Sequence, residues 1–268
     1  MAVAAVVKLG GDVLAPPALA AVAADIGRAR DAGRRLVIVH GGGPQATELG
    51  RRLGLEPNLV GGRRITDGPT LDVMKMVVAG RLNVDLVAAL LAAGVPAVGL
   101  SGTSGLIRAH RRPPRAVSGS GGAPVDFGLV GDVDGFDARL LDLLDGGGYL
   151  PVVACLAAGG ADGVLNINAD VVASQLAAAL GAGALVACTS VGGVRRDKDD
   201  PATRLARLTV AQARAAIADG TVQGGMIPKL EEAFGPLAAG VGAVHIVAPG
   251  EIAASLATPG TAGTLLVP

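Results

Sequence analysis

The chain has 268 residues and a mass of 26.2 kDa, which suits one large α/β domain or two fused lobes of roughly 130 residues each. Half of the residues are apolar and 17% are charged, which excludes disordered and collagen-like chains. The 23 basic residues balance 23 acidic ones and only 1% of the residues are aromatic, which argues against binding to nucleic acid or to an anionic membrane.

The two cysteines and the apolar segments of the chain also indicate its cellular compartment. Cys155 and Cys188 lie in apolar runs and are expected to be buried free thiols in a reducing environment. The N-terminal apolar run is too short for a signal peptide, and no uninterrupted apolar stretch reaches the roughly 18 residues of a membrane span. We therefore expect a soluble, cytoplasmic protein with no membrane partner.

Strands alternate with helices along most of the chain. Apolar, β-branched runs that end in glycine or polar turns predict strands at 3–8, 35–40, 95–100, 150–155, 184–188 and 243–248. Ala- and Leu-rich segments of helical period predict helices near 17–31, 44–54, 69–93, 137–145, 170–181, 208–219, 227–239 and 250–257. This alternation predicts an α/β fold whose mostly parallel sheet is covered on both faces.

Residues 106–133 interrupt this pattern with Pro-Pro, a Gly/Ser run and four arginines. Flanking strand-like pieces predict an antiparallel hairpin with a long tip. Its positive charge suits either a solvated loop or the steering of an anionic ligand. A boundary near 175–180 would divide the chain into a larger N-terminal lobe and a smaller C-terminal lobe.

Glycine-rich turns follow the first two predicted strands. Lys8 ends the first strand, at the sheet edge where α/β proteins bind ligands, and Gly10 and Gly11 behind it let backbone N–H groups approach an anion. A glycine turn beside a solvated lysine is the alternative. The second turn, HGGGP at 40–44, opens a helix with proline, and its free N–H groups suit phosphate or carboxylate.

These turns differ from two common nucleotide-binding motifs. Gly41, Gly43 and Ala46 match G-x-G-x-x-A, the dinucleotide fingerprint. The fingerprint requires an acidic residue at the end of a second strand, whereas residues 58–68, NLVGGRRITDG, have no strand pattern. The P-loop sequence G-x-x-x-x-G-K-[ST] does not occur, which excludes P-loop NTPases.

Polar groups gather at two later positions. Arg63 and Arg64 follow two glycines, and one of the two guanidinium groups is expected to clamp a carboxylate. Asn166 and Asn168 alternate on a strand-like piece and so point the same way. Asp170 behind them either caps the next helix or takes part in ligand binding.

Lys229 is one of only four lysines among the 23 basic residues. It lies in the first turn of a predicted helix, behind Gly224 and Gly225. A cation at that end of a helix opposes the helix dipole, so Lys229 indicates a bound anion. Together with Lys8 and Asp170 it suggests a phosphoryl-transfer site without a P-loop.

With these motifs the sequence resembles the amino acid kinase family, and within it the members that act on N-acetyl-L-glutamate. The resemblance covers essentially the whole chain in the same order, through VVKLGGD, VHGGGPQ, GRRITD, VGLSG, LNINAD and GGMIPK. It implies an αβα sandwich around a mainly parallel eight-stranded sheet. Residues 1–175 would form a lobe for the amino acid and for dimerisation, and residues 176–268 a lobe for ATP.

The resemblance also implies roles for individual residues. Lys8 and Lys229 would stabilise the transferring phosphoryl group, and Asp170 would orient both lysines. The amino acid would be bound by Gly42, Gly43, Arg64 and Asn166. ATP, carrying its own Mg²⁺, would contact Gly10, Gly11, Ser190, Gly193, Arg195, Thr221 and Gln223. No protein metal site is implied, and Ser190 stands where the family usually has aspartate.

The implied reaction is ATP-dependent phosphorylation of the side-chain carboxylate of N-acetyl-L-glutamate, an early step of arginine biosynthesis. That carboxylate is already ionised at neutral pH, so catalysis needs positioning and charge neutralisation rather than a base. The alternatives are a kinase of a carrier-protein-bound or free acidic amino acid, an NAD-dependent oxidoreductase and a non-catalytic nucleotide sensor. Because the first strand begins by about Val3, without the extra helix of arginine-inhibited hexamers, we expect an arginine-insensitive homodimer.

Overall fold

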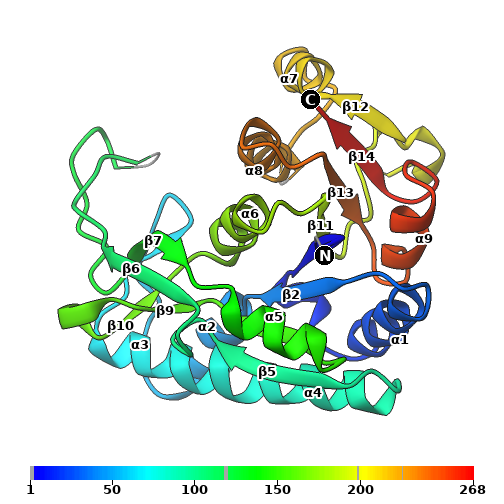
Figure 1. Ribbon diagram of the computed structural model, residues 1–268. Helices are drawn as coiled ribbons and strands as arrows, with labels where there is room; N and C mark the ends of the chain where they lie inside the picture. Colours follow the sequence, from blue (N-terminus) through cyan, green and yellow to red (C-terminus); the bar gives the residue numbers. More distant parts are fainter. Residues whose placement is uncertain (1–2, 118–119, 198, 225) are drawn as a thin grey trace.

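The computed structural model describes residues 3–117, 120–197, 199–224 and 226–268. An eight-stranded sheet with helices on both faces forms its centre (Figure 1), which confirms the predicted α/β sandwich. The strand order is β12-β14-β13-β11-β1-β2-β8-β5, and all neighbours are parallel except β13 and β14. These strands are β1 (Ala5–Leu9), β2 (Leu36–His40), β5 (Ala97–Ser101), β8 (Leu150–Ala154), β11 (Ala184–Cys188), β12 (Arg207–Thr209), β13 (Ala243–Val247) and β14 (Thr264–Val267).

All six predicted strands lie in this sheet, close to their expected bounds. Their β-branched residues are buried on both faces, as strands between two helical layers require. The sequence did not predict β12 and β14, which have only three and four residues and add an antiparallel step at one edge. β12 occupies the first residues of the helix expected at 208–219.

Helices cover the two faces in separate layers. On one face, α6 (Ala169–Ala179) packs on β1, β2 and β11, and α8 (Met226–Ala238) packs beside it. On the other, α1 (Ala18–Asp31) packs against α4 (Asn83–Ala92) and α9 (Ile252–Ala257). The remaining helical segments are η1 (Gly11–Val13), α2 (Gly43–Arg52), α3 (Gly68–Met74), the π-helical η2 (Lys75–Leu82), α5 (Arg139–Gly146), η3 (Gly160–Asp162), η4 (Pro201–Thr203) and α7 (Val210–Ala218).

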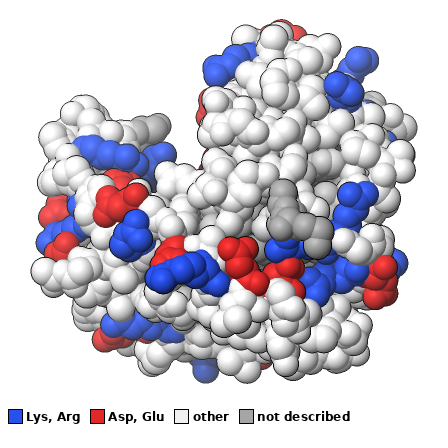
Figure 2. Space-filling view, viewed as in Figure 1, with Lys and Arg blue, Asp and Glu red and all other residues white. Residues whose placement is uncertain are grey.

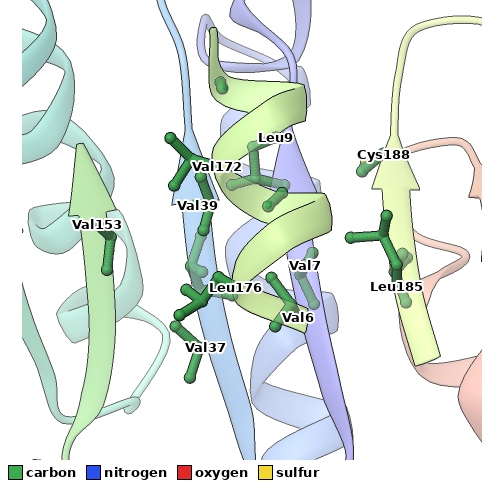
Figure 3. Close-up of a cluster of buried hydrophobic side chains, with 14 of the residues drawn as sticks. Val6, Val7, Leu9, Val37, Val39, Val153, Val172, Leu176, Leu185 and Cys188 are labelled. Atoms are coloured by element: carbon green, nitrogen blue, oxygen red, sulfur yellow. The ribbon is translucent and has the colours of Figure 1, made fainter. Parts of the chain in front are cut away.

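The core beneath α6 fixes that helix on the sheet. Val172 and Leu176 of α6 lie over side chains of β1 and β2, including Val6 and Val39 (Figure 3), and all four are fully buried. Burial of each such side chain contributes about 1.5–3 kcal/mol. The first turn of α6 is therefore held above the carboxyl ends of β1 and β2.

A second, four-stranded sheet stands beside this sandwich. The predicted hairpin is confirmed as β6 (Ile107–Arg111) paired antiparallel with β7 (Gly131–Phe136), and positions 118–119 of its tip lie outside the described residues. Two short strands complete the order β10-β9-β6-β7. The sequence did not predict β9 (Leu156–Ala158), whereas β10 (Val164–Asn166) is part of the strand-like piece expected around Asn166, and Asn168 lies beyond its end. Figure 2 shows a hollow between the part of the surface formed around this second sheet and the C-terminal half of the chain.

A small hairpin occupies the stretch in which the sequence showed no strand pattern. It consists of β3 (Leu59–Val60) and β4 (Arg63–Arg64), which pair antiparallel. In the described part of the chain, no helix combines the length and the apolar character needed to cross a bilayer.

A buried carboxylate joins the two ends of the fold. Asp25 of α1 is fully buried and accepts hydrogen bonds from the backbone N–H groups of Ile252 and Ala253, which begin α9. Arg28 donates to the same carboxylate at 2.9 Å. Since α1 follows the first strand and α9 precedes the last one, Asp25 connects the expected N-terminal and C-terminal lobes.

We predict that Asp25→Ala lowers the free energy of unfolding by about 2–3 kcal/mol, because it leaves buried N–H donors without an acceptor. Urea denaturation followed by circular dichroism measures this change. Arg28→Ala is the control, since the Arg28 side chain is 58% exposed and its ion pair is worth less than about 1 kcal/mol. An unchanged urea midpoint for Asp25→Ala would contradict the prediction.

Candidate active site

The first-strand lysine forms an ion pair with the first turn of α6. Lys8 Nζ lies 2.6 Å from Asp170 Oδ1, and the two side chains are 14% and 27% exposed. Asn168 is the N-cap of α6, because its side chain accepts a hydrogen bond from the backbone N–H of Asp170 at 2.7 Å. The interpretation of Asp170 as the cap is therefore wrong, and its carboxylate is available to Lys8.

Glycine turns next to Lys8 leave room for an anion. A Cβ atom on Gly11 would lie 2.7 Å from Gln45 Oε1, and one on Gly42 would lie 2.3 Å from Leu82 Cδ1, so neither position accepts a side chain without rearrangement. Helix α2 begins at Gly43 and directs the positive end of its dipole at this space. Within the described residues, the N–H groups of Gly11 and Gly42 have no acceptor and are free for a ligand.

A buried histidine holds the second glycine turn, at 41–43, in place. His40 ends β2 with no exposed surface, and burial lowers its pKa to about 4, so the imidazole is neutral. Its Nδ1 lies 3.0 Å from the Gly41 carbonyl oxygen, and Asn83 Nδ2 donates to its Nε2 at 2.9 Å. Asn83 also donates to the carbonyl oxygen of Val152 in β8. This network fixes the glycine turn on the sheet.

A cavity of about 440 Å³, the arginine cavity, lies over these turns. It is lined by eight of the predicted residues, Lys8, Gly10, Gly11, Gly42, Gly43, Arg64, Asn166 and Asp170, and by Arg63, Arg112 and Arg115. Arg64 donates to the Gly43 carbonyl oxygen at 3.2 Å and to Thr47 Oγ1 at 2.6 Å, and neither acceptor is a carboxylate. Asn166 Nδ2 donates to Thr66 Oγ1 at 3.1 Å.

A second space of about 250 Å³, the lysine cavity, lies between α6, α8 and the sheet. Its charged lining residues are Lys8, Asp170, Lys229 and Glu232, and its floor is apolar. Lys8 is in register with Ala187 of β11, which is in register with Ile246 of β13, so these side chains share one face of the sheet. The two predicted catalytic lysines therefore converge on one cavity from β1 and from the first turn of α8.

A third space of about 670 Å³, the C-terminal cavity, lies on the other side of Lys229. Four residues expected at the nucleotide line it, namely Gly193, Arg195, Thr221 and Gln223. Gly10 and Gly11, expected there as well, line the arginine cavity instead. Gly225 lies outside the described residues.

Ser190 lines none of these three cavities. Its backbone N–H donates to Asp12 Oδ2 at 2.7 Å. Burial raises the pKa of Asp12, but this hydrogen bonding and the positive charge of Lys229 together bring that pKa below its ordinary value. Asp12 therefore stays ionised and attracts Lys229 towards the first glycine turn.

Sequence patterns did not single out two further features of the site, Glu232 and Asp12. Arg112 and Arg115 come from the basic segment at 106–133, for which the sequence left open a solvated loop or the steering of an anionic ligand. Arg112 is buried and paired with Asp132 at 2.7 Å. Only Glu232 had a usable signal, since it follows Lys229 by three residues and so lies on the same helix face. Across the described ranges, no group of three or more His, Cys, Asp and Glu side chains is placed to hold a metal ion.

Known proteins resemble the chain over its full length. Residues 4–248 match the amino acid kinase family. The acetylglutamate kinase of Sorangium cellulosum is 55% identical over 267 residues, which cover 98% of this chain and 94% of that protein. The acetylglutamate kinase of Anaeromyxobacter dehalogenans is 56% identical over 266 residues, 98% of each chain.

A solved structure shows the same fold. The N-acetylglutamate synthase of Neisseria gonorrhoeae, solved with coenzyme A and N-acetyl-glutamate, superposes with a TM-score of 0.78 at 26% identity. The match covers 98% of this chain and 59% of that protein. On the family match and on these two relatives above 50% identity, the chain belongs to the amino acid kinase family.

Proposed function

We propose that this chain transfers the γ-phosphoryl group of ATP to the side-chain carboxylate of N-acetyl-L-glutamate, as in an early step of arginine biosynthesis. The observation that carries the proposal is the convergence of Lys8 and Lys229 on one cavity. Lys8 also lines the arginine cavity and Lys229 also lines the C-terminal cavity, so the lysines connect an acceptor space with a donor space. The names of the relatives at 55% and 56% identity support this acceptor.

The proposed step needs no base. An oxygen of the ionised acceptor carboxylate forms a bond to the γ-phosphorus, and the bond from that phosphorus to the β–γ bridging oxygen breaks. The products are N-acetyl-L-glutamyl 5-phosphate and ADP, and no proton is exchanged. Lys8, Lys229 and the N–H groups of Gly11 and Gly42 would neutralise charge on the moving group, and each such donor is worth about 3–4 kcal/mol.

The arginine cavity supports an acylated substrate over a free amino acid. Four arginines line it, of which Arg112 is paired with Asp132, and Asp170, one of its two lining carboxylates, is paired with Lys8. An α-ammonium group would be repelled there, while an α-carboxylate would be attracted. We propose that Arg64 clamps the α-carboxylate and that Asn166 binds the amide end of the substrate.

The C-terminal cavity supports nucleotide binding by the second lobe. All of its lining residues lie within 176–268, and the arginine cavity is lined from 1–175 with the single exception of Glu232. Mg²⁺ would be held by the phosphates of ATP and would neutralise part of their charge, which fits a site without a carboxylate cluster among the described residues.

The edge of the large sheet supports a homodimer. β5 is the terminal strand there, and the adjacent α4 exposes Val84 and Leu91 by 64% and 54%, while Met76 in the preceding η2 is 51% exposed. Val84 and Leu91 are seven residues apart in α4, about two helical turns, so they project on one side. We propose that a second copy of the chain covers this apolar surface.

Trapping of the acyl phosphate as a hydroxamate tests the proposed function, with MgATP and N-acetylglutamate as substrates. We predict that Lys8→Ala and Lys229→Ala each lower turnover about a hundredfold or more, because each removes a donor to the transferring phosphoryl group. The control Lys75→Ala removes an exposed lysine that is paired with Asp72 on the surface. Wild-type turnover in either site variant, with circular dichroism unchanged, would refute the assignment.

Arg64→Ala is predicted to raise KM for N-acetylglutamate about ten- to a hundredfold, because a hydrogen bond to a charged group is worth about 1.5–3 kcal/mol. KM for ATP should stay the same. Initial rates at varied acceptor concentration measure both values, with Arg52→Ala, at the exposed end of α2, as the control. The role of Arg64 is disproved if its variant binds the acceptor as well as wild type does.

Val84→Glu is predicted to convert the dimer to a monomer, because it places a charge in the apolar surface of the helix. Multi-angle light scattering measures the mass of the particle. Ala215→Glu, exposed on α7 at the opposite edge of the sheet, is the matched control and should remain dimeric. A variant at position 84 that keeps the dimer mass would rule out this surface.

A further inference from the structure

Glu232 occupies the junction of three spaces in the cleft. It follows Lys229 by one turn of α8 and therefore lies on the same helix face. It lines the arginine cavity, the lysine cavity and an outer groove of about 440 Å³ between α6 and α8. Asp170 lines the same three spaces from α6. Two carboxyl groups thus face the passage through which the phosphoryl group would move.

The charges around Glu232 come from four elements. Lys8 of β1, Lys229 of α8 and Arg63 of β4 are positive and lie near enough to act on its carboxyl group. Asp170 of α6 is negative and acts in the opposite direction. Farther along the same spaces lie Arg64, Arg112 and Arg115 in the arginine cavity, and Glu231 in the outer groove.

The protonation of Glu232 sets the net charge of the lysine cavity. With Glu232 ionised, two ammonium groups face two carboxylates, and the four lining charges sum to zero. With Glu232 neutral, the sum is +1. A cavity with a net positive charge stabilises an arriving phosphoryl group, whereas a neutral one does so much less.

The environment makes the neutral form of Glu232 accessible near neutral pH. Partial desolvation in the cleft and the Asp170 carboxylate raise the pKa of Glu232 to about 7, against the opposing effect of Lys8, Lys229 and Arg63. An anionic phosphate bound between the two lysines adds a further negative charge, which favours the protonated carboxyl group still more.

We propose that anion binding between Lys8 and Lys229 draws one proton from solvent onto the carboxyl group of Glu232, so that the site becomes positive as the substrates bind. This inference rests on the proposed function for the identity of the anion. The proton returns to solvent when the phosphate-bearing ligand leaves. Phosphoryl transfer itself remains free of proton exchange. Glu232 acts on the reaction only through the field at the lysines and is a positioning residue.

The pH dependence of kcat/KM for MgATP tests the proposal, measured from ADP release between pH 6 and 9. In the wild type kcat/KM should fall above about pH 7, by an amount that approaches tenfold per pH unit. The reason is that the reactive form of the enzyme carries a proton on Glu232, and this proton is lost as the pH rises. Glu232→Gln is always neutral and should lose this fall. Glu231→Gln, the neighbouring glutamate that lines only the outer groove, should keep it. The same fall in Glu232→Gln as in wild type would overturn the proposal.

Proton uptake on nucleotide binding provides a second readout that needs no catalysis. Calorimetric titration with MgADP at pH 7.5, in two buffers of different ionisation enthalpy, gives the number of protons bound. The wild type should take up more protons than Glu232→Gln. Any protons that the nucleotide itself releases are the same in both titrations and cancel when the two values are subtracted. Equal uptake would overturn the role of Glu232. If the difference is present while no hydroxamate forms, the proposed acceptor is wrong and the role of Glu232 stands.

Discussion

The ion pair between Lys8 and Asp170 connects the centre of the sheet with the helix above it. β1 lies between β11 and β2, so Lys8 emerges at the carboxyl edge where parallel strands present ligand sites. Asp170 is fixed over it because α6 is packed onto β1 and β2 and capped by Asn168. The 2.6 Å contact holds the ammonium group in the cleft before any substrate is present.

That ion pair also makes the second lysine necessary. Asp170 balances the charge of Lys8, so a net attraction for phosphate has to come from Lys229, from the glycine N–H groups and from the N-terminal end of α2. Lys229 reaches the same cavity from α8, on the helix whose next turn brings Glu232. The site is therefore assembled from β1, α6 and α8, segments that are far apart in the sequence.

Much of this arrangement was predictable from sequence because the signals were local. Long β-branched runs marked the six central strands, and a lysine at a helix N-terminus conflicted with the dipole in a way that only a ligand resolves. β12, β14 and β9 are too short to show a period and form through pairing with other segments. Asn168 and Asp170 both suit the cap position of α6, so the sequence alone could not decide whether Asp170 caps the helix or takes part in ligand binding. Glu232 looks like an ordinary solvated helix residue until the fold brings Asp170 and two lysines beside it.

The most direct measurement of the central claim is a crystal structure of the enzyme with MgADP, N-acetylglutamate and a planar aluminium fluoride, which mimics the phosphoryl group in transfer. We expect the Nζ atoms of Lys8 and Lys229 both to lie within hydrogen-bonding distance of that fluoride group, between the ADP and the acceptor carboxylate. A bound fluoride group from which either lysine points away would show that the two lysines do not act together on the phosphoryl group.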